Sequence, residues 1–293
     1  MKEQLPFFSV IIPTHNRNAQ VKTCLQALAV QAYPRDRFEV VVVDDGSAEP
    51  PREIVAFFSE ALNVTLLVEP HGGPSAARNA GAARARGEFL AFTDDDCAPT
   101  PEWLENIAAC LVNFPTCLVG GRTINALTEN IYSAASQALI DVIYAHFNRD
   151  PANAQFLASN NMAMPAAQFH AVDGFNSSFR VAEDRDFCDR WLRHGYRMTY
   201  APEVVIHHRH YLNPRSLWRQ HFNYGRGAFL FHQSSVRRGT KFRFEPAFYL
   251  SIFRFPLTGN AGARGLFVQA LMAEIQMANA AGFLFQAVKS RGV

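Results

Sequence analysis

The first half of the chain alternates short apolar runs with longer amphipathic segments. The apolar runs have the length of β-strands and are rich in Val, Ile, Leu and Phe: Phe7–Ile12, Phe38–Asp44, Val64–Glu69 and Phe89–Thr93. Because they are apolar almost throughout, both faces of each strand are expected to be buried, as in a parallel sheet. The segments between them have helical length and pattern: Ala19–Gln31, Arg52–Leu62 and Ser75–Arg86. This order predicts a doubly wound α/β sheet with right-handed crossovers.

The second half of the chain mixes predicted helices with extended runs. Helices are predicted over Trp103–Phe114, within Asn130–Phe147 and over Asp184–His194, and Gly195 fits a left-handed helix end. Extended segments are predicted near Cys117–Gly120, around Phe156–Met164 and over Tyr196–Ile206. After Leu212 the sequence changes to basic and aromatic helices. We therefore expect a main domain over residues 1–211 and a C-terminal helical extension over residues 212–293.

Polar and acidic residues follow three of the predicted strands. The three segments are Pro13-Thr14-His15-Asn16, Asp44-Asp45-Gly46-Ser47 and Asp94-Asp95-Asp96. In open α/β sheets, ligands bind beyond the carboxyl ends of the strands, which meet at one edge. The pattern therefore predicts a ligand site at that edge.

Asp94, Asp95 and Asp96 are three adjacent carboxylates that follow a buried strand. Like charges at this distance repel one another, and a bound divalent cation removes that cost. Hard oxygen ligands suit Mg²⁺ or Mn²⁺, so one of these ions is the expected cofactor. A solvated acidic turn or a helix N-cap before Pro99 is the alternative, which the second acidic turn at Asp44-Asp45 makes less favourable.

Composition and charge narrow the class of protein further. The 293 residues are 48% hydrophobic, which supports one large core and a modest appendage. A net charge of +2 argues against nucleic acid as a partner. Five cysteines without a CxxC pair predict buried thiols rather than disulfides or a zinc site. With no secretory signal and no apolar run of about 18 to 20 residues, we expect a cytoplasmic protein, with association at the cytoplasmic face of the membrane left open.

Several motifs in a fixed order together resemble a known family. They are Ser9–Arg17 (SVIIPTHNR), Val41–Ser47 (VVVDDGS), Gly73–Gly81 (GPSAARNAG) and Phe92–Asp96 (FTDDD), followed by Asp173-Gly174-Phe175, Glu183-Asp184 and Arg190. Each motif is weak alone, but their order and spacing are specific. From about Ser9 to about His208 the chain resembles family 2 glycosyltransferases of the GT-A fold. The resemblance implies a Rossmann-like, mixed, mainly parallel sheet flanked by helices, and sugar transfer from a nucleotide-diphosphate sugar to an acceptor hydroxyl.

The resemblance assigns donor-binding roles to residues at the strand ends. Pro13, Thr14 and Asp45 would hold the nucleotide base and ribose, with Asn16 and Asp44 close by. Arg78 resembles an arginine that reaches the nucleotide, and a guanidinium suits phosphate oxygens. A salt bridge from Arg78 to Asp45 is the alternative.

Two further segments have predicted donor-binding roles. Gly72 and Gly73 would leave free N–H groups at a helix start, which is a favourable anion site. The segment Ser159-Asn160-Asn161-Met162 resembles one that shapes the donor and acceptor pocket. Its carboxamides, Asn161 in particular, would hold sugar hydroxyls or else satisfy loop backbone.

Asp94 and Asp96 match the outer positions of the family's DxD motif. The resemblance implies that Asp96 ligates the metal, that Asp94 contacts ribose or the metal, and that Asp95 is a further donor-binding candidate. The metal would neutralise the diphosphate leaving group. A histidine often completes this coordination in GT-A enzymes, and spacing favours His208 over His207. The alternative is that both imidazoles cap backbone groups.

Glu183 and Asp184 stand at the start of a predicted helix and resemble the family's ED motif. Inverting transfer requires a carboxylate that takes the proton of the acceptor hydroxyl, and we assign this role to Asp184 ahead of Glu183. A plain helix N-cap is the alternative. The acceptor is expected to be a glycan or a lipid-linked molecule, in polysaccharide or cell-envelope biosynthesis.

Other functions fit the sequence less well. A dinucleotide-dependent oxidoreductase should show GxGxxG after the first strand, and no glycine follows Pro13 there. A nucleotidyltransferase is a closer alternative but typically has a glycine-rich first loop. A non-catalytic nucleotide-sugar-binding protein would not need the metal-binding and base residues.

From Tyr211, the last residue of the main domain, into the C-terminal extension, the sequence alternates aromatic and basic side chains. These residues are Tyr211, Trp218, Phe222, Tyr224 and Phe229 with Arg215, Arg219, Arg226, Arg237, Arg238, Lys241 and Arg243. Three interpretations stay open: packing on the main domain, peripheral association with an anionic membrane, or a homo-oligomer interface.

Overall fold

The computed structural model describes residues 5–239, 248, 250–252 and 262–291. It divides into two compact units. The first, here called the sheet unit, comprises Met1–Ile124 and Asp150–Arg209, and the second, the helical unit, comprises Asn125–Arg149 and His210–Val293. The helical unit thus includes a segment from the middle of the chain, while the boundary expected after Tyr211 stays a prediction. Lys241 and Arg243 lie outside the described residues.

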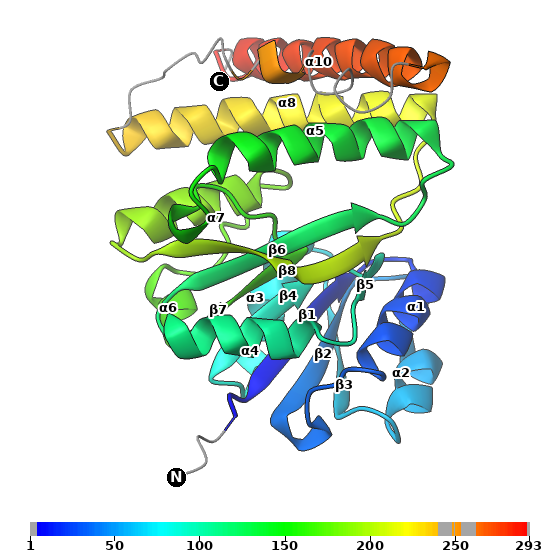
Figure 1. The fold of residues 1–293 in the computed structure, drawn as a ribbon, viewed down its shortest axis with the longest axis vertical. Helices are drawn as coiled ribbons and strands as arrows, with labels where there is room; N and C mark the ends of the chain where they lie inside the picture. The colour runs from blue at the N-terminus through cyan, green and yellow to red at the C-terminus, as the bar shows by residue number, and fades with distance from the viewer. Residues whose placement is uncertain (1–4, 240–247, 249, 253–261, 292–293) are drawn as a thin grey trace. The chain divides into compact units, whose positions relative to one another are not determined.

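Eight strands form a single sheet in the order β3-β2-β1-β4-β7-β6-β8-β5 (Figure 1). Their bounds are β1 Phe8–Thr14, β2 Phe38–Asp45, β3 Val64–Glu69, β4 Phe89–Thr93, β5 Cys97–Pro99, β6 Leu118–Asn125, β7 Asn161–Pro165 and β8 Met198–His208. The first four strands pair in parallel. β7 pairs antiparallel with β4 and with β6, and β5 pairs antiparallel with β8. The mixed sheet expected from the sequence is confirmed.

Helices of the sheet unit connect the strands and cover the sheet. They are α1 Asn18–Leu28, α2 Arg52–Phe58, α3 Pro74–Arg84, α4 Trp103–Asn113, α6 Ala166–Ala171 and α7 Glu183–Arg193, with 3₁₀ turns η1 Arg35–Arg37 and η2 Pro151–Asn153. Every residue of β1 and β2 is buried, as their continuous apolar sequences predict. All five cysteines are thiols, and four of them are buried.

Gly81 brings α3 close to the sheet. A Cβ atom at this position would lie 2.6 Å from Ile11 Cγ2 on β1 and 2.9 Å from Val43 Cγ2 on β2, so a larger residue would push the helix outward. Arg78 lies one turn earlier on the same helix. Close packing at Gly81 therefore fixes the distance of Arg78 from the sheet edge.

The strand register brings the acidic segments together. Thr14 of β1 pairs with Asp44 of β2, and Thr93 of β4 pairs with Asn161 of β7. β1 lies between β2 and β4, and all three run in the same direction. The ends of β1 and β2 and the Asp94–Asp96 segment therefore lie at one edge, as the sequence predicts.

The helical unit contains three long helices side by side, which Figure 1 shows as α5, α8 and α10. Their bounds are Ile131–Phe147, Pro214–Arg237 and Ala263–Lys289. Leu139 of α5, Leu217 of α8 and Met272 of α10 belong to one apolar core. Asn213 and Ser216 form a capping box at the start of α8. Among the described residues, no helix has the length and apolarity required to cross a membrane.

Candidate functional site

Asp95 connects the end of β4 to the end of β1. Its side chain is buried, Thr14 Oγ1 donates to its Oδ2 at 2.7 Å, and Arg17 Nη1 donates to its Oδ1 at 3.1 Å. Burial raises the pKa of Asp95 to about 6, although the charge of Arg17 opposes this. Asp95 and Thr14 thus bind each other, and their predicted roles toward the donor stay predictions.

Asp96 and His208 lie together because β5 pairs antiparallel with β8, with Cys97 opposite His208. His208 Nε2 lies 3.2 Å from Asp96 Oδ1, and Arg17 Nη1 lies 3.1 Å from Asp96 Oδ2. Successive side chains of a strand point to opposite faces, so His207 points away from Asp96, and it is exposed. A carboxylate oxygen and an imidazole nitrogen at this separation can share a divalent cation. This geometry supports His208 over His207.

Arg78 links Asp94 to Glu183. The guanidinium is buried, and it donates from Nη2 to Asp94 Oδ1 at 2.6 Å and from Nη1 to Glu183 Oε1 at 3.0 Å. Burial opposes its charge, but the carboxylates outweigh burial and raise the pKa of Arg78 above its ordinary value. The alternative salt bridge to Asp45 is wrong. The side chain of Asp94 remains 30% exposed and so is accessible to a ligand.

Asp45 binds the two glycines that precede α3. Its Oδ1 accepts from Gly72 N–H at 2.7 Å and from Gly73 N–H at 3.1 Å. The expectation that these N–H groups are free for a donor phosphate is therefore wrong, because the anion they bind is the carboxylate of Asp45. Gly46 has φ +74°, and a Cβ there would lie 2.7 Å from His71 N, so this turn requires glycine.

Two histidines to which the sequence analysis gave no role lie beside Asp45. His71 Nδ1 lies 2.9 Å from Asp45 Oδ2, and His15 Nδ1 lies 2.8 Å from the backbone oxygen of Asp45. Their rings are 4.5 Å apart between centroids. His15 lies within the recognised segment Ser9–Arg17 and His71 directly precedes Gly72, so their positions after β1 and β3 were a usable signal. Arg17, at the start of α1, was likewise missed as a partner of Asp95 and Asp96.

Asn16 and Asp44 order the turn after β2. Asn16 has φ +55°, its Oδ1 accepts from Ala48 N–H at 3.0 Å, and its own N–H donates to Ser47 Oγ at 2.7 Å. Asp44 Oδ2 accepts from Ser47 N–H at 3.0 Å, whereas its buried Oδ1 has no hydrogen-bond partner within the described residues. Pro13, in contrast, is a buried residue of β1 paired with Val43.

α7 begins with Glu183 and Asp184 after a strained residue. Ala182 has φ +64°, a left-handed conformation that costs a residue with a Cβ about 1 kcal/mol or more. Asp184 Oδ1 accepts from Arg185 N–H at 2.8 Å. Burial, and then the negative charge of Glu183, raise the pKa of Asp184 to about 7. Such a carboxyl group can both accept and release a proton near neutral pH.

The motif residues around Phe175 and Arg190 hold the chain that leads to α7. Arg190 donates to Asp186 Oδ2 at 2.8 Å, to the backbone oxygen of Gly174 at 2.7 Å and to that of Val172. Asn79 of α3 donates to the backbone oxygen of Phe175 at 2.7 Å. These contacts anchor the loop before α7 to two helices and so position Asp184.

Asn161 is fully buried and makes three internal hydrogen bonds. Its Oδ1 accepts from Trp103 Nε1 at 2.8 Å, and its Nδ2 donates to the backbone oxygens of Val204 at 2.9 Å and Arg122 at 3.2 Å. These bonds join β7 to α4, β8 and β6. They favour a structural role, and the predicted contact of Asn161 with the donor is not supported by its surroundings.

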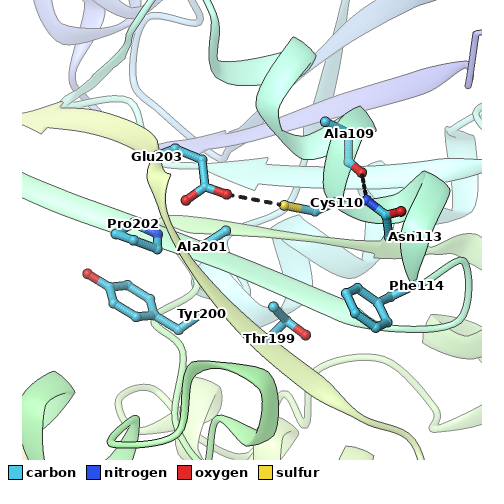
Figure 2. A pocket seen from close by; sticks show the side chains of 9 residues that line it. All are labelled: Ala109, Cys110, Asn113, Phe114, Thr199, Tyr200, Ala201, Pro202 and Glu203. Carbon is cyan, nitrogen blue, oxygen red and sulfur yellow. Dashed lines mark hydrogen bonds between the residues drawn. The ribbon is translucent and has the colours of Figure 1, made fainter.

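A pocket of about 310 Å³ lies between α4 and β8 (Figure 2). In Figure 2, Cys110 and Glu203 face each other across it, with Sγ 3.7 Å from Oε1. Burial raises the pKa of Cys110 to about 11. None of the predicted site residues lines this pocket: its lining is Ala109, Cys110, Asn113, Phe114, Thr199, Tyr200, Ala201, Pro202 and Glu203.

Three curated proteins are similar to about two thirds of this chain. Glycosyltransferase AglE of Haloferax volcanii is 31% identical over 207 residues, which cover 70% of this chain and 67% of AglE. Validoxylamine A glucosyltransferase of Streptomyces hygroscopicus subsp. limoneus is 29% identical, covering 68% of this chain and 51% of that protein. Pre-mycofactocin glycosyltransferase of Mycobacterium tuberculosis is 28% identical, covering 69% of this chain and 42% of that protein. The alignment thus spans about half or less of the latter two proteins.

Two solved structures share the fold at low sequence identity. Mannosyltransferase PcManGT from Pyrobaculum calidifontis, in complex with GDP-Man and Mn²⁺, matches with a TM-score of 0.64 at 20% identity, covering 99% of this chain and 81% of that chain. S. aureus TarS 1–349 in complex with UDP-GlcNAc matches with a TM-score of 0.55 at 19% identity, covering 98% and 92%. The GT-A-like fold predicted from the sequence is confirmed.

The family profile described as Glycosyl transferase family 2 matches residues 9–181, from β1 to the residue before Ala182. This range contains β1 except Phe8, the strands β2 to β4, Arg78 and all three aspartates of the Asp94–Asp96 segment. The chain therefore belongs to glycosyl transferase family 2.

Proposed function

We propose that this glycosyltransferase transfers a sugar from a nucleotide-diphosphate sugar to an acceptor hydroxyl, with inversion, and that Asp184 is the general base. The observation that carries the proposal is the raised pKa of Asp184, about 7, at the start of α7. The start of this helix is connected to Asp94, because Arg78 bonds both Glu183 and Asp94. A base of this pKa is half-ionised at neutral pH, which suits proton transfer.

Asp184 and the adjacent Glu183 have different surroundings, which supports different roles. Glu183 pairs with the buried guanidinium of Arg78, 3.0 Å from Nη1 to Oε1, which holds its side chain in place. Asp184 would take the proton of the acceptor hydroxyl while the acceptor oxygen bonds to the anomeric carbon. The bond from that carbon to the diphosphate oxygen breaks at the same time, and the nucleoside diphosphate leaves.

Asp96 and His208 are the residues that would hold a divalent cation. The fit rests on the 3.2 Å between a carboxylate oxygen and an imidazole nitrogen, a set that accommodates Mn²⁺ or Mg²⁺. Asp94, which is partly exposed and lies two residues before Asp96, would supply a further oxygen to the metal or to the donor ribose. A cation bound here would stabilise the negative charge of the leaving diphosphate. PcManGT was solved with GDP-Man and Mn²⁺, which supports the same choice for this chain.

Asp45 and the turn after β2 would form the nucleotide end of the site. TarS binds UDP-GlcNAc and PcManGT binds GDP-Man, so uridine and guanosine diphosphate sugars are the first donors to test. The ordered groups Asn16, Asp44, Asp45 and Ser47 restrict the shape of this region. A preorganised turn lowers the entropy cost of binding a base. A glycan or a lipid-linked molecule is the acceptor class we propose.

The test separates donor binding from transfer. Wild type and Asp184→Asn are screened for thermal stabilisation by UDP- and GDP-sugars with Mn²⁺, because a ligand that binds the folded state stabilises it by mass action. Both proteins should be stabilised by the same donor, and only wild type should then transfer or slowly hydrolyse it. Full turnover by Asp184→Asn would refute the assignment of the base. Failure of every donor to stabilise either protein would refute the proposed donor class.

A further inference from the structure

The outward side of α10 is an exposed apolar surface. Leu266, Met277, Leu284 and Val288 follow one another at helical spacing and are 59% to 73% exposed. Phe267 and Phe285 flank them and are also more than half exposed. We call these six residues the apolar face of α10. Exposed large apolar groups gathered on one helix in this way mark an interaction surface.

The opposite side of α10 is already packed against α8. A Cβ atom on Gly282 would lie 1.8 Å from the backbone oxygen of Phe222, and one on Gly225 of α8 would lie 1.9 Å from that of Asn279. The two backbones therefore touch. Leu271, Met272 and Ile275 are buried in the core of the helical unit. Since α10 buries one side within its own unit, its apolar face remains for a separate partner.

The charge of the helical unit identifies that partner. Its sequence has twelve arginines and lysines against four acidic residues, a net charge of +8, although the whole chain carries only +2. Arg264, Lys289 and Arg291 are exposed at the two ends of α10. On α8, Arg215, Arg219 and Arg237 are exposed together with Trp218 and Tyr224. Basic residues at the ends of a helix with an exposed apolar face are typical of helices that bind anionic lipid surfaces.

We propose that the apolar face of α10 binds the surface of an anionic phospholipid bilayer. The six apolar side chains would enter the boundary between headgroups and acyl chains, with α10 parallel to the surface because its other side packs on α8. The exposed arginines would pair with lipid phosphates. A second copy of the chain fits less well, since it would bring a second helical unit with a net charge of +8 against the first. The proposal does not depend on the donor, metal or base assignments.

Vesicle flotation tests the proposal with the full chain. Wild type should float with vesicles of phosphatidylglycerol and phosphatidylcholine at low salt, and its binding should weaken at high salt and on phosphatidylcholine alone. The variant Leu266→Gln/Met277→Gln/Leu284→Gln should bind about tenfold more weakly or worse, because three inserted apolar groups are lost. The matched control Phe57→Ser/Val112→Ser changes exposed apolar residues of the sheet unit and should bind like wild type.

Intrinsic fluorescence gives a second measurement. Trp103 and Trp191 are fully buried, so Trp218, which is 41% exposed, should dominate any change on binding. A blue shift with anionic vesicles is expected. The melting temperature of the triple variant should stay close to that of wild type, since all three positions are exposed.

Three outcomes would overturn the proposal. These are no binding to anionic vesicles at low salt, equal binding by the triple variant, and a lipid-free dimer by light scattering that the triple variant converts to a monomer. The last result would assign the apolar face to a second copy of the chain.

Discussion

Arg78 Nη1 donates a 3.0 Å hydrogen bond to Glu183 Oε1, although the two residues are 105 positions apart in the chain. The same guanidinium bonds Asp94, so one buried arginine holds both the start of α7 and the residue after β4. The residue beside the proposed base is thereby fixed relative to the proposed donor site. Positioning of this kind is a large part of catalysis, since small displacements of reacting groups cost much of the rate.

Replacing Arg78 by leucine should destabilise the protein by about 3 kcal/mol or more, because Glu183 would keep a buried charge without its partner. Urea unfolding measures the effect. Arg193→Leu is the control on α7, because Arg193 pairs with Asp189 at a more exposed site and its loss should cost less than about 1 kcal/mol. Equal costs for the two changes would contradict the buried network.

The activity of wild type should rise with pH through a midpoint near 7, where Asp184 loses its proton. Above pH 7, Asp184→Asn should lower kcat by about a thousandfold or more, because general-base catalysis contributes on the order of 10² to 10⁴ in rate, and the variant should lose the rise of kcat with pH. A pH series of kcat with saturating donor and Mn²⁺ measures both effects. A wild-type profile flat from pH 5.5 to 8.5 would exclude Asp184 as the titrating base.

Asp184 should also make stability depend on pH. Its pKa in the folded protein, about 7, lies above the ordinary value of 3.8, so the folded state binds the proton more tightly than the unfolded state does. Its contribution to stability is therefore full below about pH 4 and is lost as the pH rises toward 7. Asp184→Asn removes this partly buried charge and should raise the melting temperature by a few degrees at pH 8, and by progressively less as the pH falls toward 4. A lower melting temperature at pH 8 would contradict this.

Much of this site could be predicted from the sequence because it depends on local order. The parallel strands β1, β2 and β4 can be recognised in the sequence as mainly apolar runs, and the carboxyl ends of parallel strands lie at one edge of the sheet. Long-range partners could not be predicted in this way. The sequence pattern does not show that Gly72 and Gly73 bind Asp45, or that Arg78 bonds Glu183 rather than Asp45.

The pairing of β5 and the boundaries of the two units also could not be predicted from the sequence pattern. β5 has only three residues, too few for any periodicity, yet it brings Asp96 to His208. The helix α5 was predicted, but its apolar side matches a sheet or another helix equally well. Only the structure places it with α8 and α10 in the helical unit.

Asp96→Asn and His208→Gln should each raise the Mn²⁺ concentration needed for half-maximal activity, because each change removes one ligand of the proposed cation site. Activity titrated with Mn²⁺ after chelator treatment measures the shift, which should be about tenfold or more, since loss of a single ligand weakens metal sites at least this much. His207→Gln is the matched control, because the exposed neighbour should leave the titration unchanged. An equal shift for both histidine variants would remove His208 from the site.

Gly282→Val should disrupt the helical unit, because its Cβ would lie 1.8 Å from the backbone oxygen of Phe222 and backbone cannot move aside cheaply. We expect a loss of about 3 kcal/mol or more, measured by urea unfolding. Gly262→Ala, at the start of the same helix, has nothing within 4 Å of the new Cβ and should change stability by less than about 0.5 kcal/mol. Unchanged stability in Gly282→Val would show that α8 and α10 are not in backbone contact.

Replacing the neighbouring residues Asn160 and Asn161 should have different effects, on KM for Asn160 and on stability for Asn161. Asn161→Ala leaves Trp103 N–H and the backbone oxygens of Arg122 and Val204 without their partner, and should cost about 3 kcal/mol of stability. Asn160 is half-buried, and its Oδ1 has no hydrogen-bond partner within the described residues. Asn160→Ala should therefore change stability by less than about 1 kcal/mol while raising KM for the donor or acceptor. Urea unfolding and steady-state kinetics on both variants decide between them. If Asn161→Ala were as stable as wild type but bound donor poorly, Asn161 rather than Asn160 would be the residue that contacts the sugar.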